Sequence, residues 1–247
     1  MSRQSRQAGL PPFLLTRPAL QGARFSDQLR ARFGGGIRVI ASPLLAPRFL
    51  DAVVPDREFA GVIFTSETGV AGFRRLSAET HGVAWCVGDR TAQAARAAGF
   101  SAQSAGGDAN ALVAAIRAAG QRGPLLHVRG REAIGGVTEA LNLAGIETVS
   151  SIVYVQELQP LSGEAQAILK GAAAVIAPVF SPRTAAILAA LPEVQSRQSA
   201  LWIAALSPNV AAAAAPARPE RIATATLPDA DALLDAVARI IAAASEP

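Results

Sequence analysis

The chain has 247 residues, of which 51% are hydrophobic and 17% charged, so it has the composition of a globular protein and not of a disordered one. Aromatic residues make up only 5%, which disfavours nucleic-acid binding by base stacking. The formal net charge of +4 rests on arginine, because Lys170 is the only lysine. Either a biased genome composition or an acidic ligand held by guanidinium groups would explain this preference.

Cysteine usage and hydropathy indicate the cellular compartment. Cys86 is the only cysteine, which excludes an intrachain disulfide, and its apolar neighbours predict a buried structural thiol. No signal-peptide pattern is recognisable near the N-terminus, and the apolar tracts around Ala211 and Ile240 are too short to cross a bilayer. We therefore expect a cytoplasmic protein without a membrane partner.

The first elements predict a βαβ unit. A buried strand at 13–16 precedes a helix that begins at Pro18 and runs to about Phe33, with Phe25, Leu29 and Phe33 at helical spacing. Three glycines end this helix, and a strand follows at 37–40. Residues 42–56 contain three prolines, which predict an extended crossing segment without a helix.

Two further series alternate strands with helices. The middle series has strands predicted at 61–64, 83–87, 100–102, 124–128 and 146–154. Its helices are predicted at 68–76, 91–98, 109–119 and 134–144. The last series has strands at 173–177, 201–204 and 222–226, with helices at 183–191, 209–215 and 230–244.

This order predicts the α/β class, with two similar, flavodoxin-like parallel-sheet lobes and the second inserted into the first. The first lobe combines residues 1–41 with 161–247, and the second comprises residues 57–151. Residues 42–56 and 152–160 would be connecting strands that join the lobes as a two-segment hinge. A single large sheet is the alternative topology.

Hydroxyl residues and glycines follow many of the predicted strands. They include Thr16, Thr65, Ser66, Thr91, Ser181 and Ser207. Ligands of parallel sheets bind beyond the carboxyl ends of the strands, where free N–H groups at helix N-termini favour anions. Helix capping alone would also explain each of these residues. Together they predict a polar, carboxylate-binding cleft between the lobes.

Other chemistry is sparse in the sequence. No dinucleotide fingerprint or Walker loop is present. His81 and His127 lie in separate segments without cysteine partners, so we expect no metal site and interpret His127 as a packed strand residue. Tyr154, the only tyrosine, lies at the exit of the middle lobe, where its phenol would reach the cleft. A buried tyrosine bonded to backbone is the alternative, and nucleic acid is not expected as a partner.

Short motifs along nearly the whole chain resemble the uroporphyrinogen-III synthase family. They are Leu14-Leu15-Thr16-Arg17-Pro18, Phe64-Thr65-Ser66, Val87-Gly88-Asp89-Arg90-Thr91-Ala92, Gly99-Phe100, Arg129-Gly130, Val153-Tyr154, Phe180-Ser181-Pro182, Leu206-Ser207-Pro208, and Ile222-Ala223 followed by Pro228. Their order and spacing carry the resemblance more than any one motif. The chain departs from the family at Thr68-Gly69, where Asn-Ala is frequent.

The resemblance implies a cofactor-free lyase of two α/β lobes joined by a two-stranded link. Such an enzyme cyclises hydroxymethylbilane to uroporphyrinogen III, with inversion of the last pyrrole ring through a spiro intermediate and loss of water. By family position Tyr154 would donate the proton to the departing hydroxyl, and Thr91 would orient the substrate. Residues expected to bind the substrate are Thr16, Arg17, Thr65, Ser66, Thr91, Arg129, Gly130, Ser181 and Ser207.

The resemblance also implies a place in haem, chlorophyll or cobalamin biosynthesis, a monomeric state, and contact with the preceding enzyme of the pathway as a further possibility. A non-catalytic two-lobed sensor or binding protein for a small anion or a tetrapyrrole is the alternative function, since the same architecture serves both classes.

Overall fold

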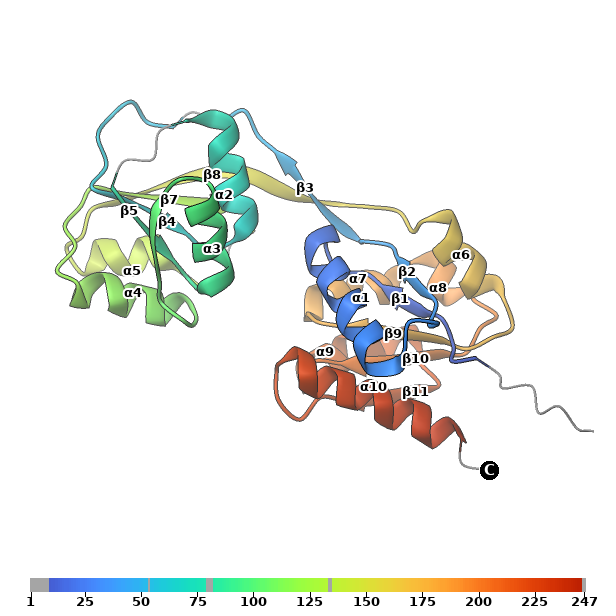
Figure 1. The fold of residues 1–247 in the computed structure, drawn as a ribbon. Helices are drawn as coiled ribbons and strands as arrows, with labels where there is room; N and C mark the ends of the chain where they lie inside the picture. The colour runs from blue at the N-terminus through green and yellow to red at the C-terminus, as the bar shows by residue number, and fades with distance from the viewer. Residues whose placement is uncertain (1–8, 53, 79–81, 133–134, 246–247) are drawn as a thin grey trace, which may run out of the picture. The chain divides into compact units, whose positions relative to one another are not determined.

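The computed structural model describes residues 9–52, 54–78, 82–132 and 135–245, which fall into two compact units. Unit 1 comprises residues 1–46 and 158–247, and unit 2 comprises residues 47–157. In Figure 1 the blue N-terminal and the gold-to-red C-terminal segments belong to unit 1, and the middle of the chain, from light blue through green to the yellow strand β8, forms unit 2.

Unit 1 contains a five-stranded sheet in the order β11-β10-β9-β1-β2, and all four pairings are parallel. The strands are β1 (Phe13–Leu15), β2 (Val39–Ala41), β9 (Val175–Val179), β10 (Leu201–Ala205) and β11 (Arg221–Thr224). The helices are α1 (Ala19–Phe33), α6 (Gly163–Lys170), α7 (Pro182–Ala190), α8 (Pro192–Gln195), α9 (Pro208–Ala214) and α10 (Ala230–Ser245), with a 3₁₀ turn at Ala215–Ala217.

Both faces of this sheet are buried, as parallel sheets require. Phe13 and Leu15 point to the side covered by α1 and α10, whereas Leu14 points to the side covered by α6, α7 and α9. The alternation follows from the two-residue period of a strand. It leaves only the ends of the strands accessible to a polar ligand.

Unit 2 contains a six-stranded sheet in the order β3-β8-β7-β4-β5-β6, in which the four pairings from β8 to β6 are parallel. The strands are β3 (Leu45–Phe49), β4 (Gly61–Phe64), β5 (Val83–Cys86), β6 (Ser101–Ser104), β7 (Leu125–Gly130) and β8 (Thr148–Leu158). The helices are α2 (Glu67–Leu76), α3 (Asp89–Ala97), α4 (Ala109–Ala118) and α5 (Val137–Leu143).

Two hydrophobic clusters cover the faces of this second sheet. One includes Phe64, Phe73 and Phe100, whose rings pack edge-on or tilted with centroids 5.3–6.0 Å apart. The other, on the opposite face, includes Ile63 and Trp85. Helices α2 and α3 cover the first cluster, and α4 and α5 cover the second. Cys86 is buried in the first cluster, as expected, and burial raises the pKa of its thiol to about 11.

The predicted α/β class with two mostly parallel sheets is confirmed, and the alternative of a single large sheet is wrong for the described residues. The strands of the first and last series form one sheet, as predicted. That the two units move as lobes about a hinge at 42–56 and 152–160 stays a prediction, as do the lobe boundaries 1–41 with 161–247 and 57–151.

Several element boundaries differ from the predictions. The crossing segment 42–56 contains β3, an edge strand that tolerates Pro47 because one side of it is unpaired. Strand β8 continues to Leu158, beyond the predicted end at Tyr154. The helix predicted to begin at residue 134, which lies outside the described residues, begins at Val137, because Gly135 and Gly136 have positive φ angles. Helices α6 and α8 were not predicted.

Candidate active site

Polar residues gather at the carboxyl edge of the unit 2 sheet. Tyr154 lies in β8, Gly130 ends β7, Ser66 follows β4 and Thr91 follows β5, and these four strands are neighbours in that order. Because all are parallel, their carboxyl ends meet at one edge, which is where ligands of such sheets bind. This part of the predicted site is therefore assembled within a single unit.

The Tyr154 phenol and the Ser66 hydroxyl contact each other at this edge. Their oxygens lie 3.1 Å apart, within hydrogen-bond distance. Ser66 is also the N-cap of α2, and its oxygen accepts a hydrogen bond from the Gly69 N–H at 3.0 Å. The Tyr154 oxygen is thus held beside the positive N-terminal end of a helix.

A β-bulge turns Tyr154 toward Ser66. His127, Val128 and Arg129 pair with Ser150, Ser151 and Ile152 in turn, but Gly130 pairs with Tyr154, which leaves Val153 as the extra residue. Without the bulge Tyr154 would lie on the same face as Ser150 and Ile152. Instead, Val153 and Tyr154 both pack in the cluster under α2. Bulges commonly redirect a side chain next to a functional site.

Gly130 lies directly against the Tyr154 ring. A Cβ atom at this position would lie 2.5 Å from Tyr154 Cζ and 2.8 Å from its Oη, closer than any real side-chain contact. Only glycine allows the phenol its observed place. Gly130, predicted as a substrate-binding residue, is here a close neighbour of the candidate proton donor.

Burial governs the acidity of the phenol. Tyr154 is 9% exposed, and this burial raises its pKa above the usual value of 10, an effect reinforced by the Glu132 carboxylate and partly opposed by the Ser66 hydrogen bond. The phenol is therefore protonated at neutral pH and retains a proton to donate. The alternative of a tyrosine bonded to backbone is wrong for the described residues, where the phenol contacts the Ser66 side chain.

Thr65 lies on the other face of the sheet, where it contacts His127. Thr65 Oγ1 and His127 Nε2 are 3.5 Å apart, and His127 Nδ1 lies 2.8 Å from Thr138 Oγ1. Thr138 Oγ1 in turn lies 2.7 Å from Ser150 Oγ. Burial, reinforced by Arg129 and partly offset by Glu139, lowers the pKa of His127 to about 4.

Sequence reasoning placed His127 correctly in the packed interior but missed its polar partners. Thr138 opens α5 and Ser150 belongs to β8, so neither is close to His127 in an obvious motif. The pairing of His127 with Ser150 across β7 and β8 brings them together. The available signal was three polar residues, Thr148, Ser150 and Ser151, at the start of a predicted apolar strand.

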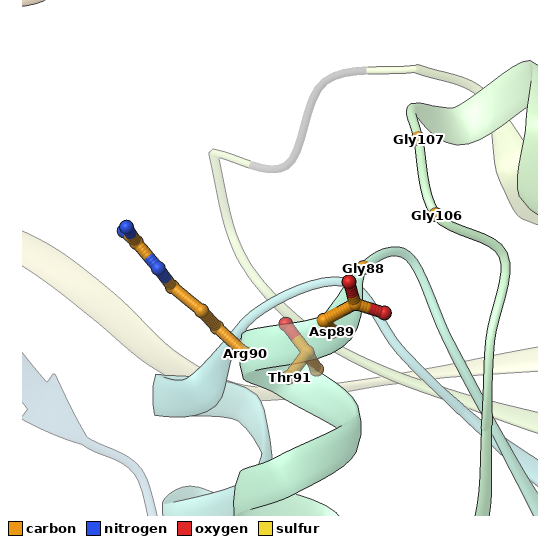
Figure 2. A pocket seen from close by; sticks show the side chains of 6 residues that line it. All are labelled: Gly88, Asp89, Arg90, Thr91, Gly106 and Gly107. Carbon is orange, nitrogen blue, oxygen red and sulfur yellow. The ribbon is translucent and has the colours of Figure 1, made fainter. Parts of the chain in front are cut away.

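Thr91 is buried in the first turn of α3, beside a shallow hollow of about 350 Å³. The hollow is lined by Gly88, Asp89, Arg90, Thr91, Gly106 and Gly107. Figure 2 shows the Arg90 side chain pointing away from the Gly106–Gly107 turn. The Asp89 side chain lies on the side of that turn, and both glycine N–H groups of the turn already donate within the protein, Gly106 to Ser104 Oγ at 3.1 Å and Gly107 to the Val87 carbonyl at 3.0 Å.

Arg129 precedes Gly130 in β7 and is half-buried. Its Nε atom is buried and has no hydrogen-bond partner among the described residues. Side chains alternate between the faces of a strand, so Arg129 lies on the opposite face from Val128 and on the same face as His127. It contributes positive charge next to the imidazole, which is one reason that the His127 pKa is low.

The predicted residues of unit 1 also lie at the carboxyl ends of neighbouring strands. Thr16 follows β1, Ser181 follows β9 and Ser207 follows β10. Thr16 is 1% exposed, and its hydroxyl has no hydrogen-bond partner within the described chain. The Arg17 guanidinium carbon lies 3.6 Å from the centre of the Phe180 ring, a cation–π contact that holds the side chain at this edge.

Both serines of unit 1 serve as helix caps. Ser181 Oγ accepts from the Thr184 N–H at 3.1 Å and donates to Thr184 Oγ1 at 2.9 Å, and Ser207 Oγ accepts from the Val210 N–H at 3.4 Å. The capping explanation therefore holds for these residues and for Ser66. It does not exclude binding, because the first N–H groups of α7 and α9 lie at the same edge.

Comparison with known families shows to which family the chain belongs. The family model described as uroporphyrinogen-III synthase HemD matches residues 24–235, most of the chain. The chain belongs to the uroporphyrinogen-III synthase family. The resemblance that the sequence motifs predicted is thereby confirmed. Membership makes the chain an enzyme of tetrapyrrole synthesis that acts on a small-molecule tetrapyrrole substrate.

One solved uroporphyrinogen-III synthetase has a similar fold. The uroporphyrinogen-III synthetase of Helicobacter pylori superimposes with a TM-score of 0.61 at 16% identity, covering 94% of this chain and 100% of its own. A mutant synthase of the extremely thermophilic bacterium Thermus thermophilus gives 0.49 at 14% identity, covering 95% and 100%. No curated protein matches the chain by sequence. The Helicobacter pylori structure supports the two-lobed α/β fold.

Two further observations concern metals and membranes. Within residues 9–52, 54–78, 82–132 and 135–245 no group of three or more His, Cys, Asp or Glu side chains is placed to hold a metal ion. No helix of that part of the chain is long and apolar enough to span a bilayer.

Proposed function

We propose that this chain cyclises hydroxymethylbilane to uroporphyrinogen III, with loss of water and inversion of the last pyrrole ring. The family match supports the reaction class. The observation that carries the proposal within the molecule is the buried, protonated Tyr154 phenol held against Ser66 and Gly130 at the carboxyl edge of unit 2. Such a reaction is that of a lyase.

Departure of the hydroxyl group requires a proton. Tyr154 donates it, so that the hydroxyl leaves as water and the phenol oxygen is briefly an anion. The Ser66 hydroxyl and the nearby N-terminal end of α2 stabilise that anion. Ring closure later releases a proton from the inverted pyrrole, which restores the phenol, so the enzyme is unchanged after one turnover.

Apart from this proton transfer, the enzyme has to position the substrate. Hydroxymethylbilane cyclises spontaneously without inversion, so the enzyme must present the substituted carbon of the last ring for attack before that reaction occurs. Oriented reactants can supply roughly 7–11 kcal/mol of the barrier. The acetate and propionate arms give the substrate many carboxylates. We assign their binding to Thr65, Ser66, Thr91, Arg129 and Gly130 in unit 2, and to Thr16, Arg17, Ser181 and Ser207 in unit 1.

We further propose a cytoplasmic monomer that needs no cofactor and receives its unstable substrate from the preceding enzyme of the pathway. The reaction involves no net oxidation or reduction and leaves the number of carbons unchanged, so proton transfer and orientation are sufficient chemistry. The carboxylates of the substrate also suit the guanidinium groups of Arg17 and Arg129, which we assign to its binding.

The products of freshly prepared hydroxymethylbilane test this function. Oxidation of the products to porphyrins and chromatographic separation of the isomers should give mainly isomer III with the protein and isomer I in a control without it. Isomer I alone in both samples would contradict the proposal and would favour a tetrapyrrole- or anion-binding protein.

A further inference from the structure

Four polar side chains form a continuous chain beneath the carboxyl edge of unit 2. It runs from Thr65 through His127 and Thr138 to Ser150, with contacts of 3.5, 2.8 and 2.7 Å. His127 is 3% exposed, and both of its ring nitrogens face hydroxyl oxygens. A neutral imidazole carries one proton, so one nitrogen donates and the other accepts.

The imidazole is neutral at physiological pH, because burial, Arg129 and the weaker opposing effect of Glu139 lower its pKa to about 4. The imidazole then has two tautomers, and each sets the direction of the hydrogen bonds on both sides of the ring. In the first, Ser150 donates to Thr138, Thr138 donates to Nδ1, and Nε2–H donates to Thr65. In the second, Nδ1–H donates to Thr138, and the Thr65 proton points inward to Nε2.

The two arrangements make Thr65 chemically different at the edge of the sheet. When Nε2–H donates to Thr65 Oγ1, the threonine proton is free and points outward. When Thr65 donates to Nε2, only its lone pairs remain for a ligand. Carboxylates accept hydrogen bonds and are repelled by lone pairs, so the first arrangement binds them and the second does not.

We propose that His127 is a positioning residue, which through its Nε2–H tautomer holds the Thr65 hydroxyl as a hydrogen-bond donor toward a substrate carboxylate. His127 itself touches no substrate. This inference rests on the proposed function for the identity of the carboxylate ligand, but the tautomer is a property of the protein alone. In this arrangement the Thr138 hydroxyl donates to Nδ1, which lies 2.8 Å away, and Ser150 donates to Thr138 at 2.7 Å.

Nitrogen-15 NMR of the whole protein with labelled histidine reads the tautomer directly. The chain has two histidines, and the spectrum of a His81→Gln variant assigns the remaining signals to His127. At pH 7 we expect His127 Nδ1 to be unprotonated and Nε2 to carry the proton, both without ligand and with uroporphyrinogen III under anaerobic conditions. A proton on Nδ1 in either sample, or a doubly protonated ring, would overturn the proposal.

Two amide variants separate positioning from packing. In His127→Gln the side-chain amide reaches the place of Nε2 and can still donate to Thr65, whereas in His127→Asn it reaches only the place of Nδ1 and contacts Thr138. We expect the Asn variant to raise KM about fivefold, the usual contribution of one neutral hydrogen bond, with kcat nearly unchanged. The Gln variant should keep a KM close to that of the unaltered protein.

Equal KM values in the Gln and Asn variants would show that His127 only fills space, and the proposal would fail. If neither variant folds, the NMR measurement on the unaltered protein decides. Failure of the proposed function is recognised separately: the unaltered protein would then give only isomer I, whichever nitrogen of His127 carries the proton.

Discussion

At the scale of single residues, the Tyr154 phenol is the proposed proton donor. Its pKa lies above 10, chiefly because the ring is buried, so the proton stays on the oxygen throughout the neutral range. The donor form is lost only as the pH rises through that pKa. We therefore expect kcat to show no decline attributable to Tyr154 between pH values of about 6 and 9.

Replacement of Tyr154 by phenylalanine removes the proton donor and keeps the ring against Gly130. We expect kcat to fall about 100-fold or more, the usual contribution of a general acid, with little change in KM. Steady-state rates of isomer III formation measure the effect. Full rate and full isomer III yield in Tyr154→Phe would show that the proton comes from elsewhere.

The low pKa of His127 predicts that the stability of the fold depends on pH. Its pKa is about 4 when folded and 6.5 when unfolded, so between these values only the unfolded chain takes up the proton, and stability falls as the pH falls. The shift corresponds to a loss of at most about 3 kcal/mol. Urea unfolding at pH 7 and pH 4 should show this loss, and His127→Gln should reduce it. An unchanged pH dependence in the variant would contradict the prediction.

The sequence indicated Tyr154 and most of the polar edge, because small polar residues that directly follow a predicted strand can be recognised from the local sequence. It did not indicate which way Tyr154 points. Strand alternation places Tyr154 on the face of Ser150, and only the bulge at Val153, a matter of pairing with β7, moves it to the face of Ser66. The partners of His127 were missed for the same reason, since pairing between strands creates the contacts.

At the scale of elements, the close approach of β7 and β8 at Gly130 fixes the phenol. In Gly130→Ala the new Cβ would lie 2.5 Å from Tyr154 Cζ, so the ring must move away from Ser66. We expect kcat to fall about tenfold or more, with a stability loss of roughly 1–3 kcal/mol from overpacking. Gly36→Ala is the control, because a Cβ there meets nothing within 4 Å.

A double variant tests whether Gly130 acts through the phenol. Once Tyr154 is phenylalanine, the proton donor is already absent, so adding Gly130→Ala should lower kcat little further. Losses of kcat that multiply fully in the double variant would contradict this role, as would a Gly130→Ala enzyme with normal kcat.

Variants of Ser181, the N-cap of α7, distinguish a role in substrate binding from a role in helix capping. Asp at position 181 would still accept the Thr184 N–H, so Ser181→Asp should keep the stability that Ser181→Ala loses, about 1 kcal/mol. If this edge binds carboxylates, the added charge should raise KM about tenfold or more through repulsion. Thermal unfolding and KM measure the two effects, and a normal KM in Ser181→Asp would remove Ser181 from the binding residues.

Most elements were predictable because their signals are local. The helix α10 has an apolar face at helical spacing, and α4 begins at the capping residue Asp108. Helix α6 had such a signal too, with Ser162 as cap and Ala165, Ile168 and Leu169 on one buried face, but the nearby Pro160 obscured it. A connecting strand was predicted within 42–56, but the bounds of β3 and its pairing with β8 were not predictable, because the pairing joins residues about 100 positions apart.

At the scale of the whole molecule, the chain builds two parallel sheets from interleaved segments. The division was visible in the sequence, because prolines interrupt the alternation of strands and helices at 42–56 and again at 160. Each sheet ends in an edge of hydroxyl residues and helix N-termini, in Thr16, Ser181 and Ser207 for unit 1 and in Thr65, Ser66 and Thr91 for unit 2. How the two edges bind one substrate stays a prediction.

The central claim is that the protein directs cyclisation toward inversion faster than the spontaneous reaction proceeds. Titration of the protein into a fixed amount of fresh hydroxymethylbilane, with isomers I and III resolved at each concentration, tests it most directly. Isomer III should replace isomer I progressively as the protein concentration rises, and Tyr154→Phe should need a much higher concentration. Isomer I alone at every protein concentration would contradict it.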